Sequence, residues 1–180
     1  KAAEEVAEKL RNEDFKGYTV GLLHGKMKPK EKEAVMAAFA AGESDILVGT
    51  QIVTKGFDFG GVSTVGILNA DNLLSTPDFR ASERAFQLMM QVAGRAGRRN
   101  DRGRVIIQTS QPKHPVIQQI ASGDYHAMAL TELSERKNFG YPPYSRLIRL
   151  LLRHEEYEKL RHASHQMAIL LRKKFGGRIM

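Results

Sequence analysis

The sequence predicts an α/β protein built on a parallel sheet. Short, continuous apolar runs recur along the first 110 residues, and buried parallel strands have this composition. Between the runs, apolar residues recur at the spacing of a helix. Strands that alternate with helices need crossover connections, which place the strands parallel to one another. The expected strands are YTVGLL (18–23), DILVGT (45–50), TVGILNA (64–70) and RVIIQT (104–109).

Three helices are expected among these strands. The first covers 1–12, where Ala, Val and Leu recur at helical spacing. The second begins at Pro29, a residue suited to a first helical turn, and Gly42 ends it. The third covers about 78–94. The second helix is expected to bury Val35, Met36 and Phe39, and the third Phe79, Phe86, Met90 and Ala93.

The pattern changes after Thr109. Residues 114–140 predict one or two helices, interrupted near Gly123. YPPY (141–144) cannot continue a helix and is interpreted as a connector. SRLIRLLLRH (145–154) is expected to form a strand, and 155–175 an amphipathic helix. The predicted domains are a lobe over 1–112, a helical connector over 113–143, and the start of another domain over 144–180.

Composition limits the possible functions. The net charge of +8 is concentrated in 91–113, with 6 basic and 1 acidic residue, and in 146–180, with 9 and 3. Such clustering attracts a phosphate backbone, although the second cluster suits a solubilising surface equally well. No apolar run approaches the roughly 18 residues of a membrane span, so no membrane partner is expected. The absence of cysteine excludes disulfides and fits a cytoplasmic protein.

The stretch QVAGRAGR (91–98) carries the strongest functional signal. At helical spacing, Gln91, Arg95 and Arg98 would share one face. Two guanidinium groups without an acid among them suit a polyphosphate. Gly94 and Gly97 have no side chains, so a ligand or another backbone can approach closely.

QVAGRAGR resembles motif VI of superfamily 2 helicases. This resemblance implies a RecA-like C-terminal lobe, like those of P-loop NTPases, whose arginines reach ATP across a cleft from a first lobe. ILVGTQIVTKGFDF (46–59) resembles motif V of the same enzymes. PDFRASERAFQLMMQVAGRAGR (77–98) and FGYPPYSRL (139–147) resemble the PriA family of primosomal helicases, which act in replication restart. The first 48 residues are more similar to the RecG family of branch-migration helicases.

The resemblance implies roles for individual residues. Gln91, Arg95 and Arg98 would be catalytic, and Gly56, Asp58 and Gly94 would bind ATP. Asp58 is also typical of a turn before two glycines, and His24 also suits a capping histidine. The residues implied to bind DNA are His24, Gly25, Thr50, Gln51, Thr54 and Lys55.

The sequence holds only half of an ATP site. It contains no phosphate-binding loop of the form G-x-x-x-x-G-K-[ST] and no DExx acidic box. ATP and Mg²⁺ would therefore be bound mainly by a first lobe, and these residues alone are expected to be inactive. Asp71, directly after an expected strand, is a weak candidate for chemistry. PriA relatives carry a cysteine-rich zinc module, so zinc is expected only in the parent protein.

The implied partners are single-stranded or forked DNA, the first lobe, and primosome or single-strand-binding proteins. Two alternatives remain open: a RecG-like helicase of branched DNA, and a non-catalytic module that binds nucleic acid or protein. Tyr141 and Tyr144 would stack on bases or pack the YPPY joint.

Overall fold

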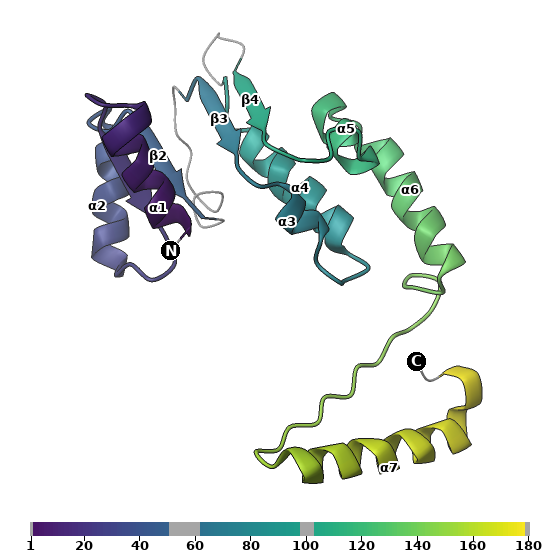
Figure 1. The fold of residues 1–180 in the computed structure, drawn as a ribbon. Coiled ribbons are helices and arrows are strands. Elements are labelled where there is room, and N and C mark those ends of the chain that lie inside the picture. Colours follow the sequence, from purple (N-terminus) through teal and green to yellow (C-terminus); the bar gives the residue numbers. More distant parts are fainter. Residues whose placement is uncertain (1, 51–61, 98–102, 179–180) are drawn as a thin grey trace. The chain divides into compact units, whose positions relative to one another are not determined.

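The computed structural model describes residues 2–50, 62–97 and 103–178. They belong to two compact units, 1–138 and 139–180, which we treat separately (Figure 1). The first unit contains all the strands found in the described residues, and the second contains one long helix.

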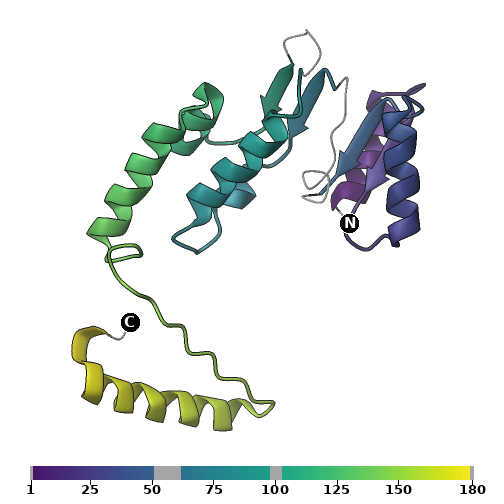
Figure 2. The ribbon, with the colours of Figure 1, turned by 180° about the vertical axis from the view of Figure 1, so that it is seen from behind.

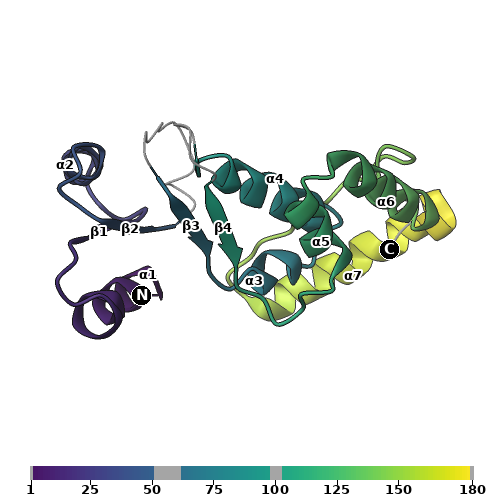
Figure 3. The same ribbon diagram turned by 90° about the horizontal axis from the view of Figure 1, so that it is seen from above.

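The first unit begins with a β–α–β element. Its elements are α1 (Ala2–Lys9), a π-helical turn (Leu10–Asp14), β1 (Val20–Leu23), α2 (Pro29–Ala40) and β2 (Ile46–Gly49). The two strands are parallel, with Val20 opposite Ile46. α1 and α2 cover opposite faces of this pair (Figure 3).

Local interactions explain the bounds of α2. Pro29 occupies its first turn, and the Lys28 N–H donates to the Glu31 carboxylate at 3.0 Å. Gly42 follows the end of the helix with φ 77°, a left-handed backbone conformation in which an L side chain would be strained. Met36 is buried with Leu23, and Val35 and Phe39 pack against them, so the predicted apolar face is confirmed.

A second β–α–β element follows. β3 (Thr64–Ile67) pairs in parallel with β4 (Arg104–Ile107), and Thr64 lies opposite Arg104. The connection contains a short helix, α3 (Asp71–Leu74), and a longer one, α4 (Ala81–Ala93). The strands thus have the expected direction, but in the described residues they form two two-stranded sheets and not one.

Two further helices complete the first unit. α5 (Pro115–Ser122) and α6 (Tyr125–Asn138) follow β4, separated by Gly123 as predicted. α4, α5 and α6 contact one another (Figure 2). Their shared core also receives Ile67 and Ile107 from the strands. The buried members of this core are Ala70, Ala85, Phe86, Met89, Val116, Ile117, Ile120 and Met128.

The start of α4 differs from the prediction. The helix begins at Ala81 and not at Asp78, because Asp78 accepts hydrogen bonds from the Arg80 backbone and side chain. Phe79 therefore lies outside the helix, where the guanidinium carbons of Arg80 and Arg136 are 5.1 and 5.2 Å from its ring centre. The buried residues of α4 are Ala81, Ala85, Phe86 and Met89. Of the expected face, Phe86 is buried in the core and Met90 packs against it, so the prediction is confirmed at these two positions.

The second unit consists of a non-regular segment and α7 (Tyr157–Phe175). The strand expected over 145–154 is wrong: no strand is assigned there. A strand is stabilised by pairing, and within the described residues no other strand pairs with this segment. Its side chains are correspondingly exposed to solvent, and Ile148 is 86% exposed. No described helix is both long enough and apolar enough to cross a membrane.

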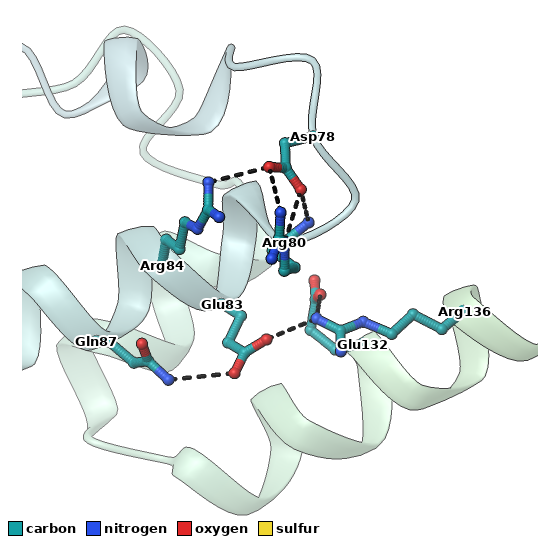
Figure 4. Close-up of polar contacts among 7 residues, drawn as sticks. All are labelled: Asp78, Arg80, Glu83, Arg84, Gln87, Glu132 and Arg136. Carbon is teal, nitrogen blue, oxygen red and sulfur yellow. Dashed lines mark hydrogen bonds and ion pairs between the residues drawn. The ribbon is translucent and has the colours of Figure 1, made fainter. Parts of the chain in front are cut away.

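A charged cluster joins the start of α4 to α6 (Figure 4). The Arg136 guanidinium donates to Glu83 at 2.6 Å and to Glu132 at 3.3 Å. Asp78 accepts from Arg80 and Arg84 at 3.1 and 3.0 Å. Glu132 is buried, and that burial raises its pKa. Hydrogen bonds from the side chain and backbone N–H of Arg80 lower the pKa of Asp78 to about 2.

Replacing Arg136 with Met should strongly destabilise the first unit, because Glu132 would remain buried without a cation. The free energy of unfolding at pH 7 should fall by about 2–3 kcal/mol, slightly less than the roughly 3–5 of a fully buried pair. The loss should shrink as the pH is lowered, since Glu132 can then be buried as the neutral acid. Urea denaturation at pH 7 and pH 4.5 measures both effects.

Arg84→Met is the matched control, since it removes the same charge from an exposed pair with Asp78. Its effect should be far smaller. Equal losses for the two variants would contradict the bridging role of Arg136.

Asp78 should contribute to acid unfolding. Its pKa is about 2 in the folded protein against an ordinary 3.8, so its stabilising effect is present above pH 4 and is lost as the pH falls through 2. Asp78→Asn should lower stability at neutral pH and flatten its decline between pH 4 and 2. Parallel pH profiles of the urea midpoint for wild type and variant would show that Asp78 is not involved.

Candidate functional site

The end of α4 carries the arginine signal of the sequence. The helix ends at Ala93, and the chain continues in a tightened turn. The Gly94 N–H donates to the Met90 carbonyl at 2.9 Å, whereas the Arg95 N–H donates to the Val92 carbonyl at 3.0 Å. The bond pattern thus shortens from four residues to three, as is common at helix ends.

Gly97 ends this turn in a left-handed conformation, with φ 82°. An L side chain is strained there, which explains the glycine. The Gly97 N–H donates to the Val62 carbonyl at 3.0 Å, two residues before β3 begins. The turn that contains Arg95 is therefore attached to the chain that leads into β3.

The predicted triad is only partly placed. Gln91 is exposed on α4, and the partly buried Arg95 lies one turn further on. Arg98 lies outside the described residues, so the prediction that it shares a helix face with Gln91 and Arg95 stays a prediction. Gly94 is exposed, and a methyl group there would make an ordinary contact, 3.4 Å from the Met90 carbonyl oxygen.

The carboxyl ends of β1 and β2 form a second candidate site. His24, Gly25 and Thr50, all predicted to bind DNA, line one hollow of about 230 Å³. The Thr50 N–H donates to the Leu23 carbonyl at 3.2 Å, which extends the strand ladder and leaves Thr50 exposed. Ala2, Ala3, Glu4 and Lys26 complete the lining.

His24 contributes its ring to this hollow. Its Nε2 lies 3.6 Å from a carboxylate oxygen of Glu4. The alternative of a capping histidine is wrong for this residue, since the residue that precedes α2 is Lys28. His114 is the capping histidine, because its Nδ1 accepts from the Val116 N–H at 3.3 Å at the start of α5. The H-P pair at 114–115 is the sequence signal for it.

Asp71 connects the carboxyl ends of β3 and β4. Its carboxylate accepts from the Thr109 hydroxyl at 2.6 Å and from the Ser110 N–H at 2.8 Å. The Ser110 N–H and the Thr109 hydroxyl lower its pKa. Asn69, with φ 53°, donates its N–H to the Gln108 side chain at 3.2 Å. These bonds join neighbouring strands, which favours the structural role over the weakly expected chemical one.

The remaining predicted site residues lie outside the described residues. They are Gln51, Thr54, Lys55, Gly56, Asp58 and Arg98. Among the residues that the structure describes, no three His, Asp or Glu side chains gather as metal ligands would.

Comparison with known proteins identifies the family. Residues 1–100 match the model of the helicase conserved C-terminal domain. The chain belongs to this helicase family. The predicted superfamily 2 helicase lobe and the α/β fold class are thereby confirmed.

Similar curated proteins include replication restart proteins PriA from several bacteria. The one from Synechocystis is 49% identical over 117 residues, 65% of this chain and 14% of the relative. The one from Treponema pallidum is 47% identical over 139 residues, 77% of this chain and 21% of the relative. The chain thus spans about a fifth or less of these relatives. The predicted resemblance to PriA is confirmed, whereas the RecG likeness of the first 48 residues stays a prediction.

The fold also has a counterpart among solved structures. The yeast DEAD-box splicing factor Prp28 matches with a TM-score of 0.51 and 16% identity, over 84% of this chain and 31% of that one. At this identity the match concerns the fold alone.

Proposed function

We propose that this chain is the second motor lobe of an ATP-dependent DNA helicase of the PriA type. The supporting observation is the placement of Arg95. It lies in a short turn whose end is attached to the chain before β3, within the matched helicase domain. An arginine whose backbone is held in this way can direct its guanidinium at a polyphosphate from a fixed starting point.

Arg95, with Arg98, would stabilise the charge that develops during hydrolysis of ATP bound mainly to a first lobe. Bound ATP and Mg²⁺ would supply the phosphoryl group and the neutralising metal. Gly94 and Gln91 would lie beside the nucleotide, together with Gly56 and Asp58. The chain's own contribution is thus electrostatic.

The hollow at the ends of β1 and β2 would contact single-stranded DNA. Thr50 offers an exposed hydroxyl there, and His24 and Lys26 add donors, as phosphate oxygens require. Gln51, Thr54 and Lys55 would continue this contact. Ligands collect at the carboxyl ends of parallel strands in open α/β folds, which favours the same location.

The wider biology follows from the relatives. Their name, replication restart protein, suggests action at forked DNA with primosome and single-strand-binding proteins. Residues 1–112 would form the motor lobe, 113–143 a connector, and 144–180 the beginning of another domain. A zinc module would belong to the longer parent protein.

Arg95→Ala should abolish turnover without abolishing nucleotide binding. DNA-stimulated ATP hydrolysis of the full-length protein that carries this chain should fall about 10³-fold or more, the usual effect of losing an arginine finger. ATP affinity, followed with a fluorescent analogue, should change little.

Arg161→Ala removes the same charge from an exposed position on α7 and should leave turnover unchanged. The isolated chain should show no hydrolysis. Normal turnover of the Arg95 variant would mean that these arginines form only a basic surface. The proposed function would then be reduced to nucleic-acid binding.

Thr50→Val should weaken binding of single-stranded DNA, because a methyl group replaces the hydroxyl that faces the phosphate. We expect a roughly 5-fold loss, since one hydrogen bond contributes about 1 kcal/mol. Fluorescence anisotropy with a labelled oligothymidine at fixed salt measures it. Thr131→Val, on the exposed side of α6, is the control, and equal affinities for all three proteins would argue against the hollow as a DNA site.

A further inference from the structure

Three backbone segments meet where the turn after α4 ends. They are Ala96–Gly97, the residues before β3, and the residues at the start of β4. The Gly97 N–H donates to the Val62 carbonyl at 3.0 Å, and the Arg104 N–H donates to the Ser63 carbonyl at 2.9 Å. The start of β3 thus contacts both the turn and β4.

Gly103, directly before β4, packs against Ala96–Gly97. A Cβ atom built on Gly103 would lie 2.3 Å from the Ala96 carbonyl carbon, 2.4 Å from the Gly97 nitrogen and 2.5 Å from the Ala96 Cβ. An ordinary contact is 3.4 Å or longer. Two of the three obstructing atoms are backbone, so no side-chain rotation can relieve the overlap.

Glycine is needed at 103 because there is no space for a side chain. Its φ lies outside the left-handed region, in contrast to that of Gly97. A left-handed backbone is therefore not the obstacle to alanine at 103, whereas the neighbouring atoms are. The turn that contains Arg95 would have to move by about 1 Å to admit the methyl group.

We propose that Gly103 is a positioning residue for Arg95. By having no side chain, it lets the start of β4 pack directly against Ala96–Gly97, so the sheet fixes the turn from which the Arg95 side chain extends. This inference rests on the proposed role of Arg95 in ATP hydrolysis. A displacement of about 1 Å at a catalytic group can reduce turnover about 100-fold.

Gly103→Ala is the direct test, and Gly66→Ala is its matched control. Gly66 lies in β3 with nothing within 4 Å of its Cβ position, so alanine there meets open space. Both variants make the same chemical change, one directly before β4 and the other within its partner strand β3. Only the variant at 103 should disturb the turn.

The structural effect is measured on this chain by amide hydrogen exchange with NMR. In Gly103→Ala, the Gly97 amide should exchange at least 10-fold faster, because its bond to Val62 is lost or lengthened. The Gln108 amide, which donates to the Ile67 carbonyl at 2.8 Å at the other end of the β3–β4 pair, should stay protected. An unchanged Gly97 amide would overturn the packing argument.

The functional effect is measured in the full-length protein as turnover per nucleotide-binding site. Gly103→Ala should lower kcat about 100-fold with little change in nucleotide affinity, whereas loss of stability alone would remove binding sites and leave turnover per site intact. If Arg95→Ala is defective and Gly103→Ala is normal, the positioning role is overturned and the proposed function stands. If both are normal, both proposals fail.

Should Gly103→Ala fail to fold, a backbone ester at residue 97 tests whether the attachment of the turn to the chain before β3 positions Arg95. It removes the Gly97 N–H that donates to Val62 without adding any atom that clashes. We expect a lower kcat per site here too, and unchanged turnover would overturn the proposal.

Discussion

The parallel pairing of β3 with β4 constrains most of the first unit. A parallel partner requires the chain to cross back from the end of one strand to the beginning of the next, and α4 makes that return. The helix must therefore end near the starts of both strands, which is where Val62 and Gly103 meet Ala96–Gly97. The location of Arg95 is thus a consequence of strand direction. The positions of Asp71 and Ser110, at the carboxyl ends of the two strands, follow from the same strand direction.

α4 is fixed at both ends by different means. At its start, Arg136 of α6 bridges Glu83 and Glu132. At its end, backbone contacts hold the turn. Between them, Phe86 and Met89 are buried in the core shared with α5 and α6. α4 therefore contacts the charged cluster on α6 at its start and leads into the Arg95 turn at its end.

The elements predicted from the sequence were those that depend on local patterning. Periodicity and turn residues predict the strand cores, the helix end at Gly42, the break at Gly123 and the buried face of α2. The gathering of His24, Gly25 and Thr50 was also predictable, because carboxyl ends of adjacent parallel strands meet at one edge. The failures depend on partners that periodicity does not contain. The strand over 145–154 needed a neighbour, and the start of α4 depended on the bonds between Asp78 and Arg80.

The glycines around Arg95 show why part of the site was not predictable. The sequence suggested that Gly94 and Gly97 make room for a ligand or for another backbone. In the structure Gly97 supplies a left-handed backbone, and the close approach occurs at Gly103, six residues further on, where protein backbone is the neighbour. A glycine's identity is the same whether it serves conformation, packing or ligand access. Only the positions of the surrounding atoms distinguish these roles. Here those atoms show that the turn containing Arg95 packs against backbone of the same lobe.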